Sequence, residues 1–301
     1  MLTRHVQGHL TWIDLVSPTQ SEVRALMDEF DINPLIAQEL LSQSFRSKVE
    51  RRGDTIYAIL HFPVVRGNQH REQEIDFVIG KHFLITTRYE TVDPLHAFAK
   101  TFEVDAVLGH LHATHGGHLF VSMAKSLYEA LNDECVLLSR KLQDIEDRIF
   151  KGDERQMVVQ LSQTSRVIHD FRQALSPHQE MLQSLDAASA RFFGAEFSYY
   201  IHDLEGTYGR MSRNIENVRD ALIELRETNN SLLSAKQNEV MKTLTVLTFV
   251  FFPVSFIGTL FQMNTVFTPL IGTPGDFWVI LSGMGVVALS CFFYFRYKGW
   301  L

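Results

Sequence analysis

The chain has 301 residues, of which 46% are apolar, and a formal net charge of −7. This length leaves room for a soluble body and a membrane unit, while the negative charge argues against a nucleic-acid partner and is compatible with gathering cations. Its two cysteines, Cys135 and Cys291, are expected to lie far apart, which excludes a disulfide framework or a CxxC metal site within one chain.

Residues 1–118 have the pattern of a cytoplasmic α/β domain. Three β-rich runs, at 56–62, 75–79 and 83–87, are separated by turn-rich or charged segments. Ser17 followed by Pro18 is a favourable N-cap and N1 pair for a first helix, and apolar residues then recur at helical spacing. We therefore expect a small sheet with helices packed on it. The start of the chain has no apolar run of signal-peptide length, so this body should stay in the cytoplasm.

Residues 119–242 have the pattern of a helical stalk region. Breaks at Gly152-Asp153 and Ser176-Pro177 predict helices near 119–150 and 154–191. In the helix that follows, apolar residues recur at an unbroken spacing of four and three, which is a heptad stripe. The stripe consists of Phe197, Ile201, Leu204, Tyr208, Met211, Ile215, Val218, Leu222 and Leu225. Neighbouring helices or other subunits must cover it.

No helix-ending signal follows the stripe. We therefore expect one continuous helix from Glu196 to about Phe261, roughly 100 Å long at 1.5 Å per residue. Such a helix cannot lie within a single compact domain, so it should couple the cytoplasmic body to the membrane.

Two uncharged stretches, 243–261 and 277–295, are each long enough to cross a bilayer as a helix. Basic residues flank the pair, with Lys236 and Lys242 before it and Arg296 and Lys298 after it, whereas the loop 262–276 has none. The positive-inside rule therefore places both termini, including the basic tail 296–301, on the cytoplasmic side of an inner or plasma membrane.

The segment from Asn238 to Asn264 reads NEVMKTLTVLTFVFFPVSFIGTLFQMN. It resembles the CorA superfamily of divalent-cation channels, whose members carry an N-E-V-M-K-x-L-T motif at the end of a long stalk helix, a proline in the first span and a terminal G-M-N tripeptide. The resemblance covers nearly the whole chain. It includes Trp12-Ile13-Asp14-Leu15 with Pro18, Lys48-Val49-Glu50, Phe83-Leu84-Ile85-Thr86, and Trp300 after the basic cluster.

The resemblance implies a membrane α+β fold. An N-terminal αβα cytoplasmic domain is followed by a stalk helix that continues into the first of two transmembrane helices, in a funnel-shaped homopentamer. The first span would line a central pore and the second would surround it. The implied ion is Mg²⁺, with Zn²⁺ or Co²⁺ as alternatives, and no organic cofactor is implied.

The family pattern places one set of side chains toward the pore axis. Their spacings of three and four between positions 238 and 255 put them on one helical side, which supports the assignment independently. The set is Asn238, Met241, Leu244, Thr248, Phe252, Ser255 and Asn264. Rings of neutral amide oxygens can recognise a hydrated magnesium ion without stripping its waters, and apolar rings at Met241, Leu244 and Phe252 can gate by dewetting.

The expected selectivity filter is Gln262, Met263 and Asn264, and it departs from the family because Gln262 stands where the motif has glycine. Glycine there would permit a conformation or a close approach that a Cβ hinders. Three consequences are open. The Gln262 amides add a polar ring and alter selectivity, the pore conducts another divalent ion such as zinc in the manner of ZntB, or transport is lost and a sensing or scaffold role remains.

Family members are closed by cytoplasmic magnesium bound between subunits, partly through an acidic residue on the stalk helix. Asp203 matches that position, and the nearest candidates for its partner carboxylate are Glu90 and Asp93. The alternative is that Asp203 is a solvated residue on a charged helix face.

Two other functions are disfavoured. The histidines at 110, 112, 115 and 118 suggest zinc, but Gly116 and Gly117 interrupt their spacing, which favours a polar loop. The sequence has no phosphate-binding glycine loop, nucleophile elbow, HExxH or paired-carboxylate motif in a convincing context, so we do not expect an enzyme.

Overall fold

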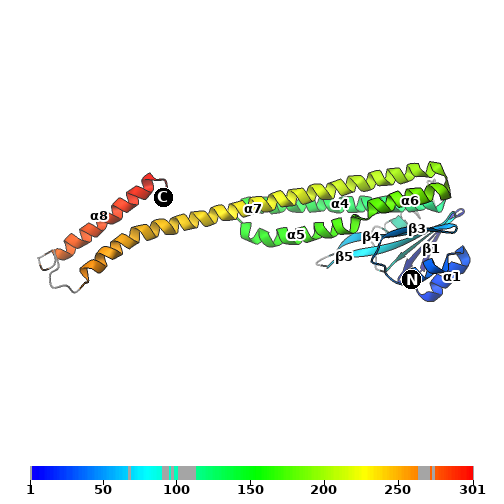
Figure 1. The fold of residues 1–301 in the computed structure, drawn as a ribbon, viewed down its shortest axis with the longest axis horizontal. Helices are drawn as coiled ribbons and strands as arrows, with labels where there is room; N and C mark the ends of the chain where they lie inside the picture. The colour runs from blue at the N-terminus through cyan, green and yellow to red at the C-terminus, as the bar shows by residue number, and fades with distance from the viewer. Residues whose placement is uncertain are drawn as a thin grey trace. The chain divides into compact units, whose positions relative to one another are not determined.

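The computed structural model describes residues 2–66, 69–89, 95, 98–100, 113–263, 272 and 275–300. The chain forms two compact units, Met1–Arg226 and Glu227–Leu301. The first contains a mixed sheet with helices on both faces, and the second contains two long apolar helical segments (Figure 1).

The described part of the first unit contains a six-stranded sheet in the order β1-β2-β6-β5-β4-β3. The strands are β1 Leu2–Gln7, β2 Leu10–Val16, β3 Lys48–Arg52, β4 Thr55–Arg66, β5 Gln69–Ile79 and β6 Phe83–Arg88. Strands β2 and β6 are parallel, and the other neighbours are antiparallel. The three predicted strands correspond to β4, β5 and β6. Strands β1, β2 and β3 were not predicted.

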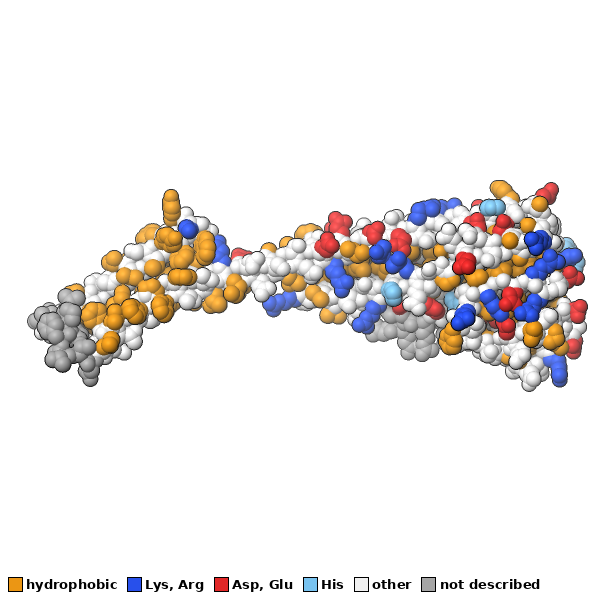
Figure 2. Space-filling model, viewed as in Figure 1, with side chains coloured by type: hydrophobic (Ala, Val, Ile, Leu, Met, Phe, Trp, Pro, Cys, Tyr) orange, Lys and Arg blue, Asp and Glu red, His pale blue; other side chains and the backbone are white. Residues whose placement is uncertain are grey.

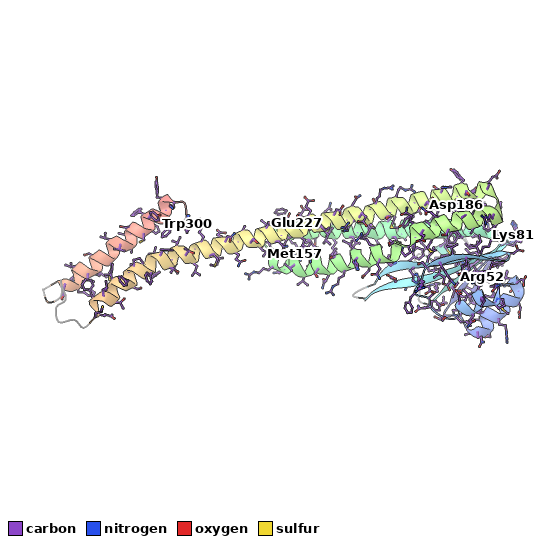
Figure 3. The ribbon with its side chains drawn as sticks, in the orientation of Figure 1. Arg52, Lys81, Met157, Asp186, Glu227 and Trp300 are labelled. Atoms are coloured by element: carbon purple, nitrogen blue, oxygen red, sulfur yellow. The ribbon has the colours of Figure 1, made fainter. Side chains whose placement is uncertain are left out.

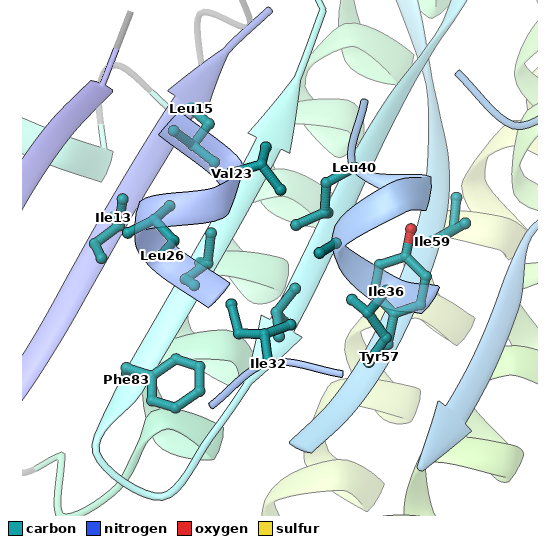
Figure 4. Packing of buried hydrophobic residues seen from close by; sticks show 13 residues of the cluster. Ile13, Leu15, Val23, Leu26, Ile32, Ile36, Leu40, Tyr57, Ile59 and Phe83 are labelled. Atoms are coloured by element: carbon teal, nitrogen blue, oxygen red, sulfur yellow. The ribbon is translucent and has the colours of Figure 1, made fainter. Parts of the chain in front are cut away.

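One face of the sheet is covered by two short helices, α1 (Gln20–Phe30) and α2 (Pro34–Glu39). Val23 and Leu26 of α1 and Ile36 of α2 lie over apolar side chains of the strands (Figure 4). All three are at most 3% exposed, so each contributes on the order of 2 kcal/mol to folding by leaving water.

The predicted cap of the first helix was wrong. Thr19, not Ser17, is the N-cap of α1, and it forms a capping box with Glu22, in which each residue satisfies an otherwise unpaired backbone N–H. Ser17 instead has φ 47°, and its backbone N–H donates to the Arg88 carbonyl over 2.8 Å. This contact ties the end of β2 to the end of β6.

The opposite face of the sheet is covered by α4 (Gly116–Phe150), α5 (Glu154–Leu175) and α6 (His178–Phe193). The breaks predicted at Gly152-Asp153 and Ser176-Pro177 are both present. The second break separates α5 from α6, so the predicted helix 154–191 is two helices.

Helix α4 begins earlier than predicted, at Gly116. A Cβ at Gly116 would lie 2.2 Å from the Phe83 carbonyl oxygen, so only glycine permits this close approach between the helix and β6. The double glycine therefore starts a helix and does not form the predicted polar loop.

The longest helix, α7, runs from Ser198 to Phe261 and follows a 3₁₀ turn at Ala195–Phe197. The predicted heptad stripe is buried along its whole length, from 0% exposure at Ile201 to 8% at Tyr208. The Tyr208 hydroxyl donates to the Leu175 carbonyl of α5 over 3.0 Å. The chain's own helices therefore cover the stripe.

Candidate ion pathway and regulatory carboxylate

In the second unit, the end of α7 and the helix α8 (Asp276–Tyr297) are both long and apolar enough to cross a membrane. Their large apolar side chains point outward, and Figure 2 shows hydrophobic side chains spread over this part of the surface. For example, Phe252 and Trp278 are each 70% exposed. Such a surface is unstable in water, and its natural environment is a lipid or protein partner.

Helix α8 packs on one side of α7. The Val246 side chain is only 5% exposed, the ring centroids of Phe249 and Phe295 lie 6.0 Å apart, and the Lys242 Nζ donates to the Gly299 carbonyl over 2.9 Å. Positions 242, 246 and 249 share one face of a helix because they are separated by four and three residues. Lys242 therefore fastens the chain's C-terminal turn, where Figure 3 labels Trp300, to the start of the first span.

The six predicted pore residues that the structure describes are all exposed in the single chain. At about 100° per residue, Leu244, Thr248 and Ser255 lie roughly opposite Val246, the residue most buried beside α8. Met241 and Phe252 lie within about 60° of that opposite face, and Asn238 lies further round. The face predicted to line a pore is therefore largely the one that α8 leaves open. Its role in conduction stays a prediction.

The hydroxyl of Thr248 is oriented within this face. Its Oγ1 donates to the Leu244 carbonyl over 2.9 Å, so the hydroxyl hydrogen is used within the helix. The oxygen keeps its lone pairs, which can accept from the water shell of a cation.

At the C-terminal end of α7 the chain tightens into a turn. The backbone N–H of Gln262 donates to the Thr259 carbonyl over 3.2 Å, and that of Met263 points to the Leu260 carbonyl over 3.4 Å. Both side chains are exposed. Among the described non-glycine residues only Ser17 and Asp31 have positive φ, so Gln262 does not occupy a backbone conformation reserved for glycine. Asn264 lies outside the described residues.

The predicted regulatory carboxylate, Asp203, lies on α7 in the first unit. Its Oδ2 accepts a hydrogen bond from the Lys125 Nζ of α4 over 2.9 Å, and the two side chains are 48% and 38% exposed. Glu90 and Asp93 lie outside the described residues. Lys125 was not predicted as a partner of Asp203, because nothing local in the chain links a lysine to an aspartate 78 positions away.

The described members of the histidine group do not form a metal site. His115 and His118 stack with ring centroids 4.0 Å apart, and Phe193 stacks on His115 at 4.1 Å. Burial and the neighbouring His118 lower the pKa of His115 to about 4, so it is neutral near pH 7. Within the described ranges, no group of three or more His, Cys, Asp or Glu side chains is arranged to hold a metal.

Comparisons with known proteins agree with this architecture. The cobalt/magnesium transport protein CorA of Thermotoga maritima is 25% identical over 298 residues, covering 97% of this chain and 83% of the relative. The zinc transport protein ZntB of Yersinia pseudotuberculosis is 21% identical over 280 residues, covering 89% of this chain and 80% of the relative.

The complete structure of the CorA magnesium transporter from Methanocaldococcus jannaschii superposes with a TM-score of 0.85 at 21% identity. The match covers 97% of this chain and 92% of that one. The family profile described as "CorA-like Mg2+ transporter protein" matches residues 7–297. The chain therefore belongs to the CorA-like family of divalent-cation transporters, as a membrane protein and not an enzyme.

Proposed function

We propose that the chain is a homopentameric divalent-cation channel that conducts Mg²⁺, with a selectivity altered by Gln262. The observation that carries the proposal is the open face of α7, where Leu244, Thr248 and Ser255 lie opposite the side packed by α8. A ring of such faces around an axis would form a pore wall, and α8 would surround it.

The side chains of this face suit a hydrated ion better than a stripped one. They combine amide and hydroxyl oxygens with apolar groups and carry no charge. Magnesium gives up its water shell reluctantly and prefers oxygen donors, whereas zinc in proteins favours histidine nitrogen and cysteine sulfur. The polar positions therefore favour Mg²⁺ over Zn²⁺ as the transported ion, and Co²⁺ is the second ion named for the Thermotoga maritima relative.

In this proposal each segment has a role. Residues 1–118 form the cytoplasmic α/β domain and 119–242 the stalk. Residues 243–261 line the pore, 262–276 form the loop on the far side of the membrane, 277–295 form the outer helix, and the basic tail 296–301 stays in the cytoplasm. Both termini then lie on the cytoplasmic side, in keeping with the basic residues at that end of each span.

Ion flux into proteoliposomes tests the proposal. The full chain is reconstituted and the uptake of Mg²⁺, Co²⁺ and Zn²⁺ is followed with entrapped fluorescent indicators under an imposed negative inside potential. We expect Mg²⁺ uptake that exceeds Zn²⁺ uptake. Uptake of zinc alone would reassign the chain as a ZntB-like transporter, and no uptake of any ion would leave a non-conducting membrane sensor or scaffold. The mass of the assembly in detergent tests the pentamer separately.

A further inference from the structure

A cavity of about 140 Å³ lies between α5 and α7 in the first unit. At roughly 30 Å³ per water molecule it has room for about five waters, and its volume is well below the roughly 300 Å³ of a pocket for a whole drug-sized ligand. Its eight lining residues come in equal numbers from the two helices. They are Ser165, Ile168, His169 and Arg172 of α5, and Arg219, Leu222, Ile223 and Arg226 of α7.

The lining contains three guanidinium groups and no carboxylate. Arg172 and Arg219 are held by Glu216, which lies beside the cavity: the Arg172 Nε donates to Glu216 Oε1 over 2.5 Å, and the Arg219 Nη1 donates to Glu216 Oε2 over 2.9 Å. Burial acts to raise the pKa of Glu216, but these hydrogen bonds and charges lower it overall, so Glu216 is ionised and orients both arginines.

Each of these arginines keeps further N–H groups for a ligand. A guanidinium has five N–H donors, and Glu216 occupies one edge of each. Arg219 also lies 3.6 Å from Asp220, whose side chain is 70% exposed. Arg226 makes no ion pair within the part of the chain that the structure describes. The cavity is therefore left with an excess of positive charge.

This donor set selects the chemistry of the ligand. Guanidinium groups match the oxygens of phosphate in a forked, bidentate geometry, and the Ser165 hydroxyl is an additional donor. A divalent cation would be repelled by three arginines, so the cavity is distinct from any metal site at Asp203. Ile168 and Leu222 are nearly buried and supply an apolar floor.

We propose that this cavity binds the phosphate groups of a small anionic molecule, either free pyrophosphate or the phosphate chain of a nucleotide. The volume admits the phosphates alone, so the remainder of a nucleotide would lie outside, against the half-exposed Ile223. Because the lining comes from two helices, the bound phosphates would bridge α5 and α7 through hydrogen bonds. In Figure 3 the label Glu227 marks the position on α7 that directly follows Arg226.

Calorimetric titration of the full chain in detergent tests this proposal. Inorganic pyrophosphate and ATP are titrated separately, with EDTA present so that no divalent cation bridges the ligand. We expect saturable pyrophosphate binding that weakens at least about tenfold in Arg226→Gln, since a hydrogen bond to a charged group is lost. Glu216→Gln keeps an acceptor for the arginines but removes the competing charge, so it should bind several-fold more tightly.

Arg213→Gln is the matched control, because Arg213 is an exposed arginine of α7 that does not line the cavity. It should bind like the unchanged chain. Equal affinity for both probes means that only the phosphates are recognised, whereas tighter ATP binding means that the nucleoside contributes.

Three results would overturn the proposal. These are no saturable binding of either probe, equal weakening in Arg226→Gln and Arg213→Gln, or loss of the assembled mass in Arg226→Gln. The last would show that an acidic side chain of a second copy fills the cavity. Binding is measured without flux, so a chain that conducts no ion can still pass this test.

Discussion

The Lys125 Nζ lies 2.9 Å from the Asp203 Oδ2, so an amine of the same chain already neutralises the carboxylate that was predicted to bind a regulatory cation. The two side chains are 38% and 48% exposed, and an exposed ion pair of this kind contributes only about 0–1 kcal/mol. A divalent cation can therefore displace Lys125, but it must compete with it.

The competition predicts opposite effects of two substitutions. Lys125→Gln should free Asp203 and lower the Mg²⁺ concentration that closes the channel by up to about fivefold, the equivalent of about 1 kcal/mol. Asp203→Ala should weaken closure by Mg²⁺. Both are measured as the Mg²⁺ dependence of flux in proteoliposomes. Lys141→Gln, which changes another exposed lysine of α4, is the control. Unchanged Mg²⁺ sensitivity in a conducting Asp203→Ala channel would reject this role.

The Gln262 backbone does not adopt a conformation reserved for glycine. Substitutions at position 262 can therefore separate the effect of the amide side chain from that of backbone freedom. If the amide itself alters selectivity, Gln262→Gly and Gln262→Ala should both raise Mg²⁺ flux, by comparable factors, since both remove the amide. If backbone freedom is what the filter needs, only Gln262→Gly will do so. Flux measured with equal amounts of reconstituted protein distinguishes the two. No change from either variant would place the determinant of conduction elsewhere.

The sequence predicted most reliably those elements whose pattern repeats. The heptad stripe from Phe197 to Leu225 predicted α7 because burial recurs every three or four residues. Strands β1 and β3 were missed because they are the edge strands of the sheet. Val6 of β1 is 60% exposed, and charged side chains make up most of β3. Edge strands carry such residues, and the apolar alternation that signals a strand is then weak.

The candidate sites also differ in whether a local sequence pattern predicts them. The face of α7 opposite Val246 follows from the three-and-four spacing of a helix, so local sequence predicts it. The Asp203–Lys125 pair and the cavity at Arg226 depend on contacts between helices that are far apart in the chain, and no local pattern encodes them. The conformation of Gln262 depends on how α7 ends, which composition alone did not indicate.

The apolar positions of the open face predict a gate. Leu244 and Phe252 are 53% and 70% exposed in the single chain, and a ring of either would repel water from a narrow pore. Leu244→Ala and Phe252→Ala should therefore raise Mg²⁺ flux several-fold under closing concentrations of Mg²⁺. Leu289→Ala on α8, where the leucine is 58% exposed, is the matched control. An equal rise in Leu289→Ala would mean that loosened packing, and not a pore constriction, controls flux.

A buried acid pair on β5 predicts how the stability of the cytoplasmic domain depends on pH. Asp76 is fully buried, and its Oδ2 accepts from the Tyr57 hydroxyl over 3.3 Å. Burial, followed by the nearby charge of Glu74, raises the pKa of Asp76 well above its ordinary value of 3.8. Burial acts to lower the pKa of His61, but Glu74 and the Ser44 carbonyl raise it overall.

The pKa values of Asp76 and His61 are both raised in the folded domain. A group whose pKa is higher in the folded state contributes stability that is fully present below its unfolded pKa, near 3.8 for Asp76 and 6.5 for His61, and that is lost as the pH rises through its folded pKa. The domain should therefore lose stability as the pH rises above these unfolded values, and it should be less stable at pH 8.5 than at pH 5.5. Asp76→Asn keeps an acceptor for Tyr57 but cannot ionise, so its stability should fall less steeply over this range.

The thermal unfolding midpoint of the full chain in detergent, measured between pH 5.5 and 8.5, checks this prediction. At pH 8.5 we expect Asp76→Asn to unfold at least about 2 °C above the unchanged chain, because each pKa unit corresponds to about 1.4 kcal/mol and each kcal/mol to about 2–4 °C. Asp54→Asn, at an exposed position in the turn before β4, should leave the profile unchanged. A uniform destabilisation by Asp76→Asn at every pH would mean that Asp76 is ionised in the folded domain, and the raised pKa of Asp76 would be rejected.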